Sequence, residues 1–168
     1  MVRRVDVSPA PKNVFWSENG QSVILALDEN FYLLSYDNDQ VTSYLSTKDP
    51  EAAPDEDDDG CEDAFQFTEE YREVIVSGLW VSADCFVYTN QKGHIYYLIG
   101  QKTMKLCNAD KKQYILGYDS KQNRLYLVDK NFNIFSYQLL LSVVNYQSAI
   151  LNDDIHGAEI YFKEVPDT

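Results

Sequence analysis

The chain has 168 residues, of which 45% are hydrophobic, and carries a formal net charge of −13. That length fits one ordinary domain with a sizeable core, and the hydrophobic fraction is typical of a globular protein. The negative charge would repel phosphate backbones and anionic lipid, which argues against binding to nucleic acid or to a membrane surface. No apolar run is long enough for a membrane span, so we expect protein partners and no direct membrane insertion.

The cysteines give a first indication of the compartment. Cys61, Cys85 and Cys107 are odd in number and form no C-x-x-C pair, which fits a reducing cytosolic setting better than a secreted disulfide framework. The basic pair Arg3 and Arg4 is not followed by the apolar stretch of a signal peptide.

The first predicted sheet has three short strands that are rich in β-branched and aromatic residues and are bounded by turn formers. They cover residues 13–17 (NVFWS), 22–27 (SVILAL) and 31–36 (FYLLSY), with Glu18-Asn19-Gly20 and Asp28-Glu29-Asn30 as the turns. Runs this short, with this composition, favour antiparallel strands over helices.

An acidic insert follows at residues 47–63 (TKDPEAAPDEDDDGCED). Its like charges repel one another and it has almost nothing to bury, so we expect residues 49–63 to form a poorly ordered, solvated loop.

Part of this insert is similar to a calcium-binding loop. Asp55, Asp57, Asp59 and Gly60 match the opening of an EF-hand, but Gln66 stands where a bidentate Glu is needed and no helix leads in. A charged surface loop is therefore the expectation, and weak divalent-ion binding is the alternative.

The middle of the chain, residues 74–100, has the clearest strand pattern. Its apolar runs are VIVSGLWV (74–81), CFVYT (85–89) and IYYLI (95–99), and Asp84, Asn90 and Gly93 lie in the gaps between them. This pattern predicts a meander of three antiparallel strands joined by tight turns.

A third copy of the pattern predicts strands at residues 113–118, 124–128 and 133–137. Residues 28–36 and 129–137 are identical at five of nine positions. Trp80 and Tyr118 lie 38 residues apart, close to the roughly 40 to 45 residues of a four-stranded propeller blade. The chain is therefore predicted to be mainly β, with about three four-stranded antiparallel blades of a partial β-propeller over residues 1–138.

The repeat also indicates which side chains hold the blades together. Seven aromatic residues at recurring positions are expected to have this structural role: Trp16, Phe31, Tyr36, Trp80, Tyr118, Phe132 and Tyr137. A propeller ring usually holds about four to eight blades, so residues 2–7 are expected to be a leftover outer strand. The open blade face then predicts a homodimer of the isolated chain, with the following helices as an alternative cover.

The periodicity changes after Tyr137. Leu139, Val143, Tyr146 and Ile150 fall on one face of a helix, and Leu140, Val144 and Leu151 widen that stripe. A second short helix is expected to begin with a cap at Asn152 or Asp153, to carry Ala158, Ile160, Tyr161 and Phe162, and to end before Pro166. Residues 139–168 are thus predicted to be a helical segment that begins an α-solenoid.

The sequence offers little for catalysis. His94 and His156 have no Cys or Asp partner at metal-ligand spacing, and no P-loop, G-x-S-x-G or G-x-G-x-x-G is present. Cys85 and Cys107 lie in or beside apolar strands, where a thiol is usually inert. We therefore expect no enzyme activity, no catalytic or metal-binding residues and no cofactor.

The string VFWSENGQSVILALDENFYLLSYD resembles a degenerate WD40 repeat, because an aromatic-Ser-x-Asn-Gly sequence opens the inner hairpin and Tyr36-Asp37 stands where Trp-Asp usually closes the third strand. Other motifs together resemble the β′ subunits of coatomer over nearly the whole chain from about Pro11 onward. These are CEDAF (61–65), SGLWV (77–81), CFVYT (85–89), LGY (116–118), NRLYL (123–127) and VVNYQ (143–147).

The resemblance implies the second WD40-like propeller and the start of the solenoid in the coatomer β′ family. It further implies a structural scaffold role in the COPI vesicle coat, in transport between Golgi and endoplasmic reticulum and within the Golgi. The implied partners are other coatomer subunits, especially the α subunit, and the implied location is the cytoplasm, peripherally on Golgi membranes and COPI vesicles. The family's dilysine cargo site belongs to the first propeller, which is absent here. An unrelated WD40-like adaptor and a calcium-binding propeller module remain the alternatives.

Overall fold

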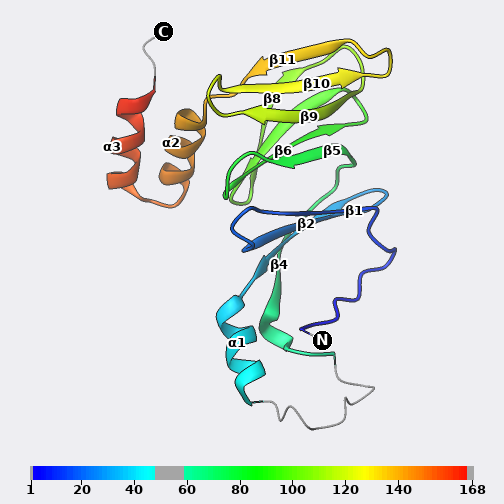
Figure 1. Ribbon diagram of the computed structural model, residues 1–168, viewed down its shortest axis with the longest axis vertical. Coiled ribbons are helices and arrows are strands. Elements are labelled where there is room, and N and C mark those ends of the chain that lie inside the picture. Colours follow the sequence, from blue (N-terminus) through cyan, green and yellow to red (C-terminus); the bar gives the residue numbers. More distant parts are fainter. Residues whose placement is uncertain (1, 48–58, 166–168) are drawn as a thin grey trace. The chain divides into compact units, whose positions relative to one another are not determined.

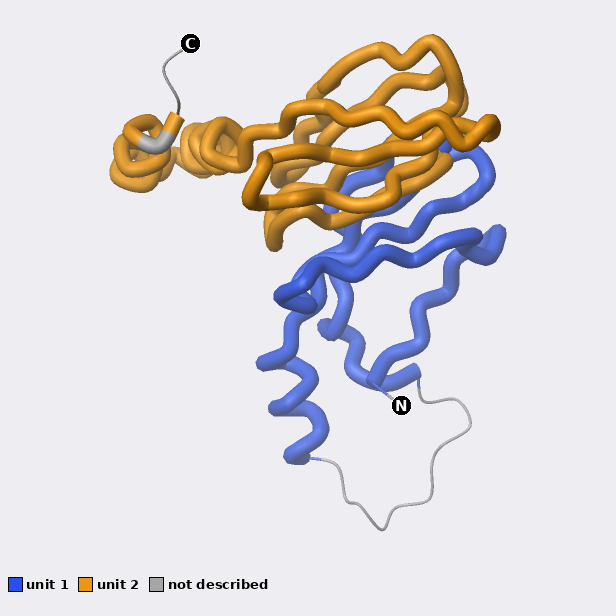
Figure 2. The backbone as a smooth tube through the Cα atoms, turned by 45° about the horizontal axis from the view of Figure 1, so that its top comes forward, with its two compact units in different colours: residues 1–74 blue, residues 75–168 orange. Residues whose placement is uncertain are grey.

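A computed structural model describes residues 2–47 and 59–165 (Figure 1). The chain divides into two compact units, residues 1–74 and residues 75–168 (Figure 2). The helical segment predicted after residue 138 falls within the second unit.

The first unit contains one four-stranded antiparallel sheet in the order β1-β2-β3-β4. Its strands are β1 (Asn13–Trp16), β2 (Ser22–Ala26), β3 (Phe31–Tyr36) and β4 (Phe65–Tyr71). Val23, Leu25 and Leu34 form its core, and Val5 and Val7 pack against them. The three predicted strands are confirmed. Residues 2–7, expected as an outer strand, instead make a single isolated bridge between Arg3 and Gly60.

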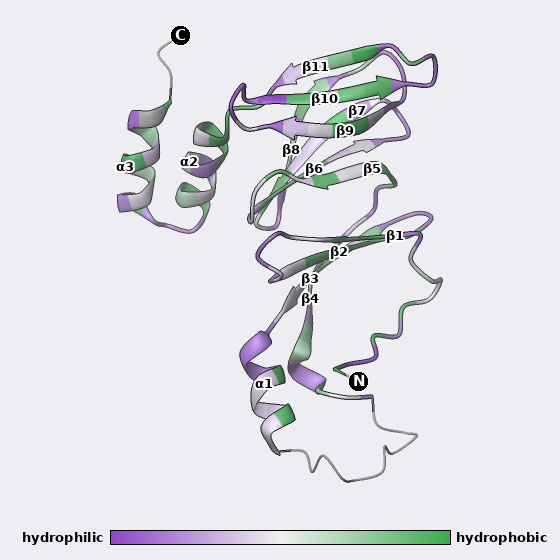
Figure 3. Cartoon of the chain, in the orientation of Figure 1, coloured by the Kyte–Doolittle hydropathy of each residue, from purple (hydrophilic) through white to green (hydrophobic). Residues whose placement is uncertain are grey.

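Besides the outer strand β4, two elements of this unit were not predicted, the helix α1 (Asn38–Thr47) and the 3₁₀ helix η1 (Glu62–Ala64). Val41 of α1 is buried with Cys61 and Ala64 in a small cluster. Figure 3 shows that the first turn of α1 is hydrophilic, which masks its apolar side in a sequence pattern.

The acidic insert divides into two parts. Residues 48–58 lie outside the described residues, so the prediction of poor order there stays a prediction. For residues 59–63 the prediction is wrong, because the Arg4 amide donates to the Asp59 carbonyl at 2.8 Å and the Cys61 amide donates to the Val2 carbonyl at 2.7 Å. These hydrogen bonds fix the end of the insert against the start of the chain.

The second unit begins with a sheet in the order β5-β6-β7-β8. Its strands are β5 (Ile75–Trp80), β6 (Cys85–Asn90), β7 (His94–Ile99) and β8 (Lys102–Asn108). The first three confirm the predicted meander. All six residues of β6 are buried, and its side chains alternate between an aromatic face, with Phe86 and Tyr88, and a face that packs on the next sheet, with Cys85 and Val87.

The next sheet has three strands in the order β11-β10-β9, where four were expected. They are β9 (Gln113–Asp119), β10 (Arg124–Asp129) and β11 (Ile134–Gln138). Leu125 and Leu127 of β10 are fully buried against the β6 face that carries Cys85 and Val87. Two hydrogen bonds also cross between the sheets, from Thr89 Oγ1 to the Gln113 carbonyl at 2.8 Å and from the Ile115 amide to Ser77 Oγ at 3.0 Å.

Two helices follow, α2 (Leu141–Leu151) and α3 (Ile155–Glu164), as predicted. Val144 and Leu151 of α2 pack onto the core of the second unit. The expected core face is partly wrong, because Ile150 is half exposed and the Tyr146 ring faces Phe162 of α3 at 5.9 Å.

The cap of α3 also differs from the prediction. Asp154 caps the helix by accepting a hydrogen bond from the Gly157 amide at 2.9 Å. The predicted cap residue Asp153 instead adopts a left-handed conformation with φ of 56° in the turn between the helices.

Candidate functional site

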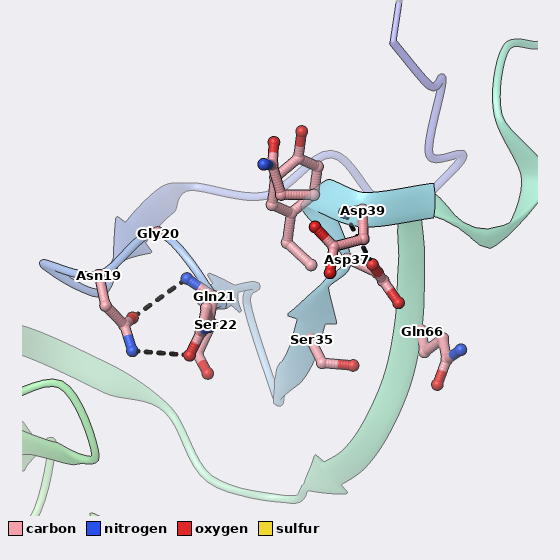
Figure 4. A pocket seen from close by; sticks show the side chains of 10 residues that line it. Asn19, Gly20, Gln21, Ser22, Ser35, Asp37, Asp39 and Gln66 are labelled. Carbon is pink, nitrogen blue, oxygen red and sulfur yellow. Dashed lines mark hydrogen bonds between the residues drawn. The ribbon is translucent and has the colours of Figure 1, made fainter. Parts of the chain in front are cut away.

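A polar pocket of about 860 Å³ lies in the first unit, between the β1–β2 turn and the start of α1 (Figure 4). Ten residues line it: Asn19, Gly20, Gln21, Ser22, Ser35, Tyr36, Asp37, Asn38, Asp39 and Gln66. The groups on its walls decide whether it could support chemistry or recognition.

One wall of the pocket is the predicted turn around Asn19. Gly20 supplies the positive φ of 69° that the turn requires. The Asn19 side-chain oxygen accepts hydrogen bonds from the Ser17 hydroxyl at 2.7 Å and the Gln21 amide at 3.1 Å, and its nitrogen donates to Gln21 Oε1 at 3.0 Å. Asn19 is therefore committed to holding the turn.

The opposite wall is the start of α1. Asp37 Oδ1 accepts hydrogen bonds from the amides of Asp39 and Gln40, both at 3.0 Å. Those amides have no partner within the helix, so Asp37 acts as its N-cap. Asp39 lies in the first turn, where a negative charge interacts favourably with the helix dipole. Both carboxylates thus have structural roles.

This arrangement suits hydrogen bonding to a partner better than catalysis. The Ser22 and Ser35 hydroxyls lie in the pocket, but no histidine lines it, so neither has a general base to activate it. Amide and carboxylate oxygens at its rim can accept hydrogen bonds from a partner's backbone amides or lysines.

The cysteines of the second unit are held as thiols. Burial, followed by the nearby charge of Asp84, raises the pKa of Cys85 to about 12. Burial also raises the pKa of Cys107. Because the thiolate is the reactive form, neither is a nucleophile at neutral pH.

Neither histidine lines the pocket of the first unit. His94 begins β7 with its Nδ1 at 3.4 Å from the Tyr96 hydroxyl, and His156 is exposed in α3.

The calcium alternative rests on Asp55, Asp57, Asp59 and Gly60. Asp55 and Asp57 lie outside the described residues, and within residues 2–47 and 59–165 no group of three or more metal-ligating side chains is found. A glycine at position 60 is explained without calcium binding, because its φ is 87° and a Cβ there would collide with the Val2 carbonyl. Gln66, in the twelfth loop position, is part of β4.

Most of the predicted structural aromatics do lie in cores or ring clusters. Phe31 is fully buried and stacks on Tyr71, and Trp80 is 8% exposed and packs against Phe86 with ring centroids 5.3 Å apart. Trp16 is 48% exposed and contacts Tyr36 edge-on at 5.8 Å. Tyr118 and Tyr137 pack against the core of the second unit.

Phe132 is the exception and corrects the alignment of the repeats. The β2–β3 hairpin closes where the Leu27 amide donates to the Asn30 carbonyl. In the β10–β11 hairpin the Asp129 amide donates to the Asn133 carbonyl, so this turn is one residue longer. The extra residue places Phe132 in the turn with φ of 64° and 88% exposure. It therefore has no core role.

Comparison with known proteins gives the family. The model of the COPA/B second beta-propeller matches residues 1–129. The chain belongs to this COPA/B second-propeller family. It is also similar to coatomer subunit beta' of Drosophila melanogaster, with 40% identity over 166 residues, and of Homo sapiens, with 37% identity over 166 residues. Coatomer subunit beta'-1 of Oryza sativa subsp. japonica is likewise 37% identical.

Each of these alignments covers 99% of this chain but only 17% of the relative. The chain therefore spans about a sixth of the length of the coatomer β′ relatives that it matches. Among the described residues, no helix has the length and apolar composition needed to cross a membrane.

Sequence reasoning missed several surfaces of this COPA/B propeller segment. Tyr114, Leu116 and Ile134 are 44%, 58% and 69% exposed on the third sheet. Their strands read as ordinary half-buried strands, so the sequence pattern does not show that these side chains stay exposed. A second apolar surface lies between α2 and α3, where a groove of about 410 Å³ is lined by residues that include Ile150, Ile155 and Phe162.

Proposed function

We propose that the chain is a structural scaffold segment of the COPI vesicle coat, acting through protein contacts in transport between Golgi and endoplasmic reticulum and within the Golgi. The supporting observation is the 37 to 40% identity to coatomer β′ subunits that runs through 99% of the chain, sheets and helices alike. The described residues also present a polar pocket and an apolar groove, which suit contacts with partner proteins. The polar pocket holds no nucleophile with an adjacent base, which fits a scaffold better than an enzyme.

The proposed partners are other coatomer subunits, especially the α subunit, and the proposed location is cytoplasmic, peripherally on Golgi membranes and COPI vesicles. The α2–α3 hairpin is the best candidate for the contact. Ile155 is 73% exposed and Phe162 is 64% exposed, and together with Ile150 they line the apolar groove between the two helices, which is unfavourable to leave in contact with water.

Affinity purification of the tagged chain from cell extract, followed by quantitative mass spectrometry, tests this proposal. Coatomer subunits, including the α subunit, should co-purify with the wild-type chain. Phe162→Asp should remove them, because it places a charge in the α2–α3 groove. Leu45→Asp is the matched control, since Leu45 is an exposed apolar residue of α1 at 51% exposure.

Wild-type chain that recovers no coat subunit would contradict the coat role. Equal recovery of coat subunits by Phe162→Asp and Leu45→Asp would leave the coat role standing but place the contact elsewhere than the α2–α3 groove. Circular dichroism on all three proteins establishes that the helices are retained.

We further propose that the isolated chain pairs as a homodimer through the open face of its third sheet. Support comes from the exposed side chains of Tyr114, Leu116 and Ile134, which form an apolar area that monomers rarely expose. Sedimentation should then give a dimer for the wild type and a monomer for Leu116→Asp, with Leu45→Asp unchanged. A wild type that stays monomeric at high concentration would contradict the dimer.

A further inference from the structure

Three connections gather at one end of the second unit: the β6–β7 turn, the β8–β9 loop and the β10–β11 turn. In an antiparallel meander, alternate connections lie at the same end of the sheets. The Ala109 amide donates to the Gly93 carbonyl at 2.7 Å, which joins the first two connections. A pocket of about 610 Å³, lined by Lys111, Lys112, Tyr114, Lys130 and Asn131, joins the last two.

This end of the unit, which we call the lysine end (Lys111, Lys112 and Lys130), is basic although the chain carries a net charge of −13. Its three lysines are exposed. The ion pairs recorded among the described residues, Arg4 with Asp6 and Lys12 with Asp28, both lie in the first unit.

The backbone that carries the lysines is held firmly. Gly93 has φ of 78°, and a Cβ on it would lie 2.7 Å from the Ala109 carbonyl and 3.0 Å from the Lys111 carbonyl. The loop therefore rests directly on the turn, and the lysines project from a defined base.

The nearest buried acid, Asp129, is already satisfied within its own turn. One of its oxygens accepts from the amides of Asn131 at 2.8 Å and Asn133 at 3.0 Å, and the other accepts from the Asn133 side chain at 3.0 Å. These bonds, chiefly the one from the Asn133 side chain, lower the pKa of Asp129, and the charge of Lys111 adds to the effect. The lowered pKa keeps Asp129 ionised. Asp129 and the exposed Asp110 of the β8–β9 loop therefore offset part of the charge of the three lysines, and a positive excess remains.

Aromatic side chains border the lysines. Phe132, at the tip of the β10–β11 turn, is 88% exposed, and Tyr114 is 44% exposed. An exposed Phe in a left-handed turn position is costly and contributes nothing to the core, so its surroundings suggest a contact with another molecule.

We propose that the lysine end binds an acidic, extended peptide segment of a partner protein that carries an apolar side chain beside its carboxylates. The charge of the pocket complements the carboxylates, and Phe132 complements the apolar side chain. Salt screens charges beyond about 8 Å at physiological ionic strength, so a peptide confined to the pocket is attracted despite the overall charge. A broad anionic surface such as a membrane would meet the negative field of the whole chain. The lysine end would act in this way whether or not the chain assembles into a coat.

Fluorescence anisotropy with a labelled oligo-glutamate peptide containing one central leucine tests the proposal, with the matching oligo-glutamine peptide as the neutral probe. The wild-type chain should bind only the acidic probe, more weakly as salt is raised. The triple variant Lys111→Gln, Lys112→Gln, Lys130→Gln should lose about tenfold or more in affinity, since several exposed ion pairs are removed together.

A second triple variant, Lys102→Gln, Lys105→Gln, Lys121→Gln, makes the same change in net charge on β8 and in the β9–β10 turn. It should keep its affinity within about twofold if the contact is local. Phe132→Ser should weaken binding of the leucine-containing probe and not of a leucine-free oligo-glutamate.

Three outcomes overturn the proposal. They are no binding of the acidic probe, equal losses in the two triple variants, or co-sedimentation with phosphatidylserine vesicles that requires the lysine end while the peptide does not bind. All of the substituted side chains are exposed, and thermal unfolding would establish that each variant is folded.

Discussion

The hydroxyl group of Tyr118 donates a hydrogen bond to the backbone carbonyl of Leu139 at 2.8 Å. Tyr118 lies in β9, and Leu139 lies between the last strand and α2. The Leu139 amide in turn donates to the Asn123 carbonyl at 2.9 Å. Because Leu139 is only 3% exposed, water is a poor substitute for these partners, and the connection from sheet to helix is fixed at this residue.

Tyr118→Phe should therefore destabilise the protein by about 1 to 2 kcal/mol, since it leaves a buried carbonyl without its donor. Tyr126→Phe is the control, because the Tyr126 hydroxyl donates to Gln122 at an exposed site. Its effect should stay within about 0.5 kcal/mol. Urea unfolding of both variants measures the difference, and equal losses would show that the Leu139 bond has no special weight.

The two tryptophans should respond very differently to truncation. Trp80 is 8% exposed, so Trp80→Ala should cost about 3 to 5 kcal/mol through the lost burial and the cavity left behind. Trp16 is 48% exposed, and Trp16→Ala should cost about 1 to 2 kcal/mol. A loss below about 1 kcal/mol for Trp80→Ala would place its ring at the surface instead.

Two strand glycines form a second matched pair. A Cβ on Gly78 in β5 would collide with the ring of Phe86, whereas a Cβ on Gly117 in β9 would meet nothing within 4 Å. Gly78→Ala should therefore cost about 1 to 3 kcal/mol by overpacking. Gly117→Ala should be neutral or stabilising by up to about 1 kcal/mol, because it restricts the unfolded chain. Thermal unfolding in parallel would rank them, and the opposite order would contradict the packing of Phe86.

The corrected hairpin register predicts opposite effects for two phenylalanines that align in sequence. Phe31→Ala should cost about 3 to 5 kcal/mol because the ring is fully buried. Phe132→Gly should leave the free energy of unfolding unchanged or raise it by about 1 kcal/mol, because glycine adopts its left-handed conformation without strain. A large loss for Phe132→Gly would restore the simple repeat alignment.

Stability should decline in alkaline solution. The pKa of Cys85 is raised from 9.0 to about 12 by burial in the folded state. The unfolded thiol therefore releases its proton first, so the stabilising contribution is complete below pH 9 and is lost as pH rises toward 12. Tyr71, with its pKa raised from 10.0 to about 12, acts in the same direction. Urea unfolding across this range should show a shallower decline for Cys85→Ala than for the wild type, and identical slopes would contradict the assignment to Cys85.

The sequence predicted strands best where both faces of the strand are buried. The run from Cys85 to Asn90 is apolar and aromatic throughout, and it forms the fully buried β6. The outer strands β4 and β8 were missed because their pattern is polar: Glu69 and Glu70 lie in β4, and Lys102 and Lys105 lie in β8. A strand at the edge of a sheet is held by backbone hydrogen bonds and needs little apolar surface, so composition does not reveal it.

The surfaces were harder to predict than the core. The lysine end combines residues from separate connections, and only the antiparallel topology brings Lys111 and Lys130 to one pocket. The face of α2 was misjudged because Tyr146 and Val144 are both apolar, and the choice of which one faces the sheets depends on where α3 packs. The family resemblance, in contrast, rests on short motifs that can be read directly from the sequence, and the second-propeller match confirms it.

The hydrogen bonds from Thr89 to Gln113 and from Ile115 to Ser77 fix how the two sheets of the second unit are aligned along their strands. The hydrophobic effect is non-directional, so apolar contact alone would let one sheet face slide along the other at little cost in free energy. A displacement by one residue along the strands would break both polar links at once and would leave the buried Thr89 hydroxyl unsatisfied. The two sheets should therefore resist sliding past each other, and a force applied to one sheet should be transmitted to the other.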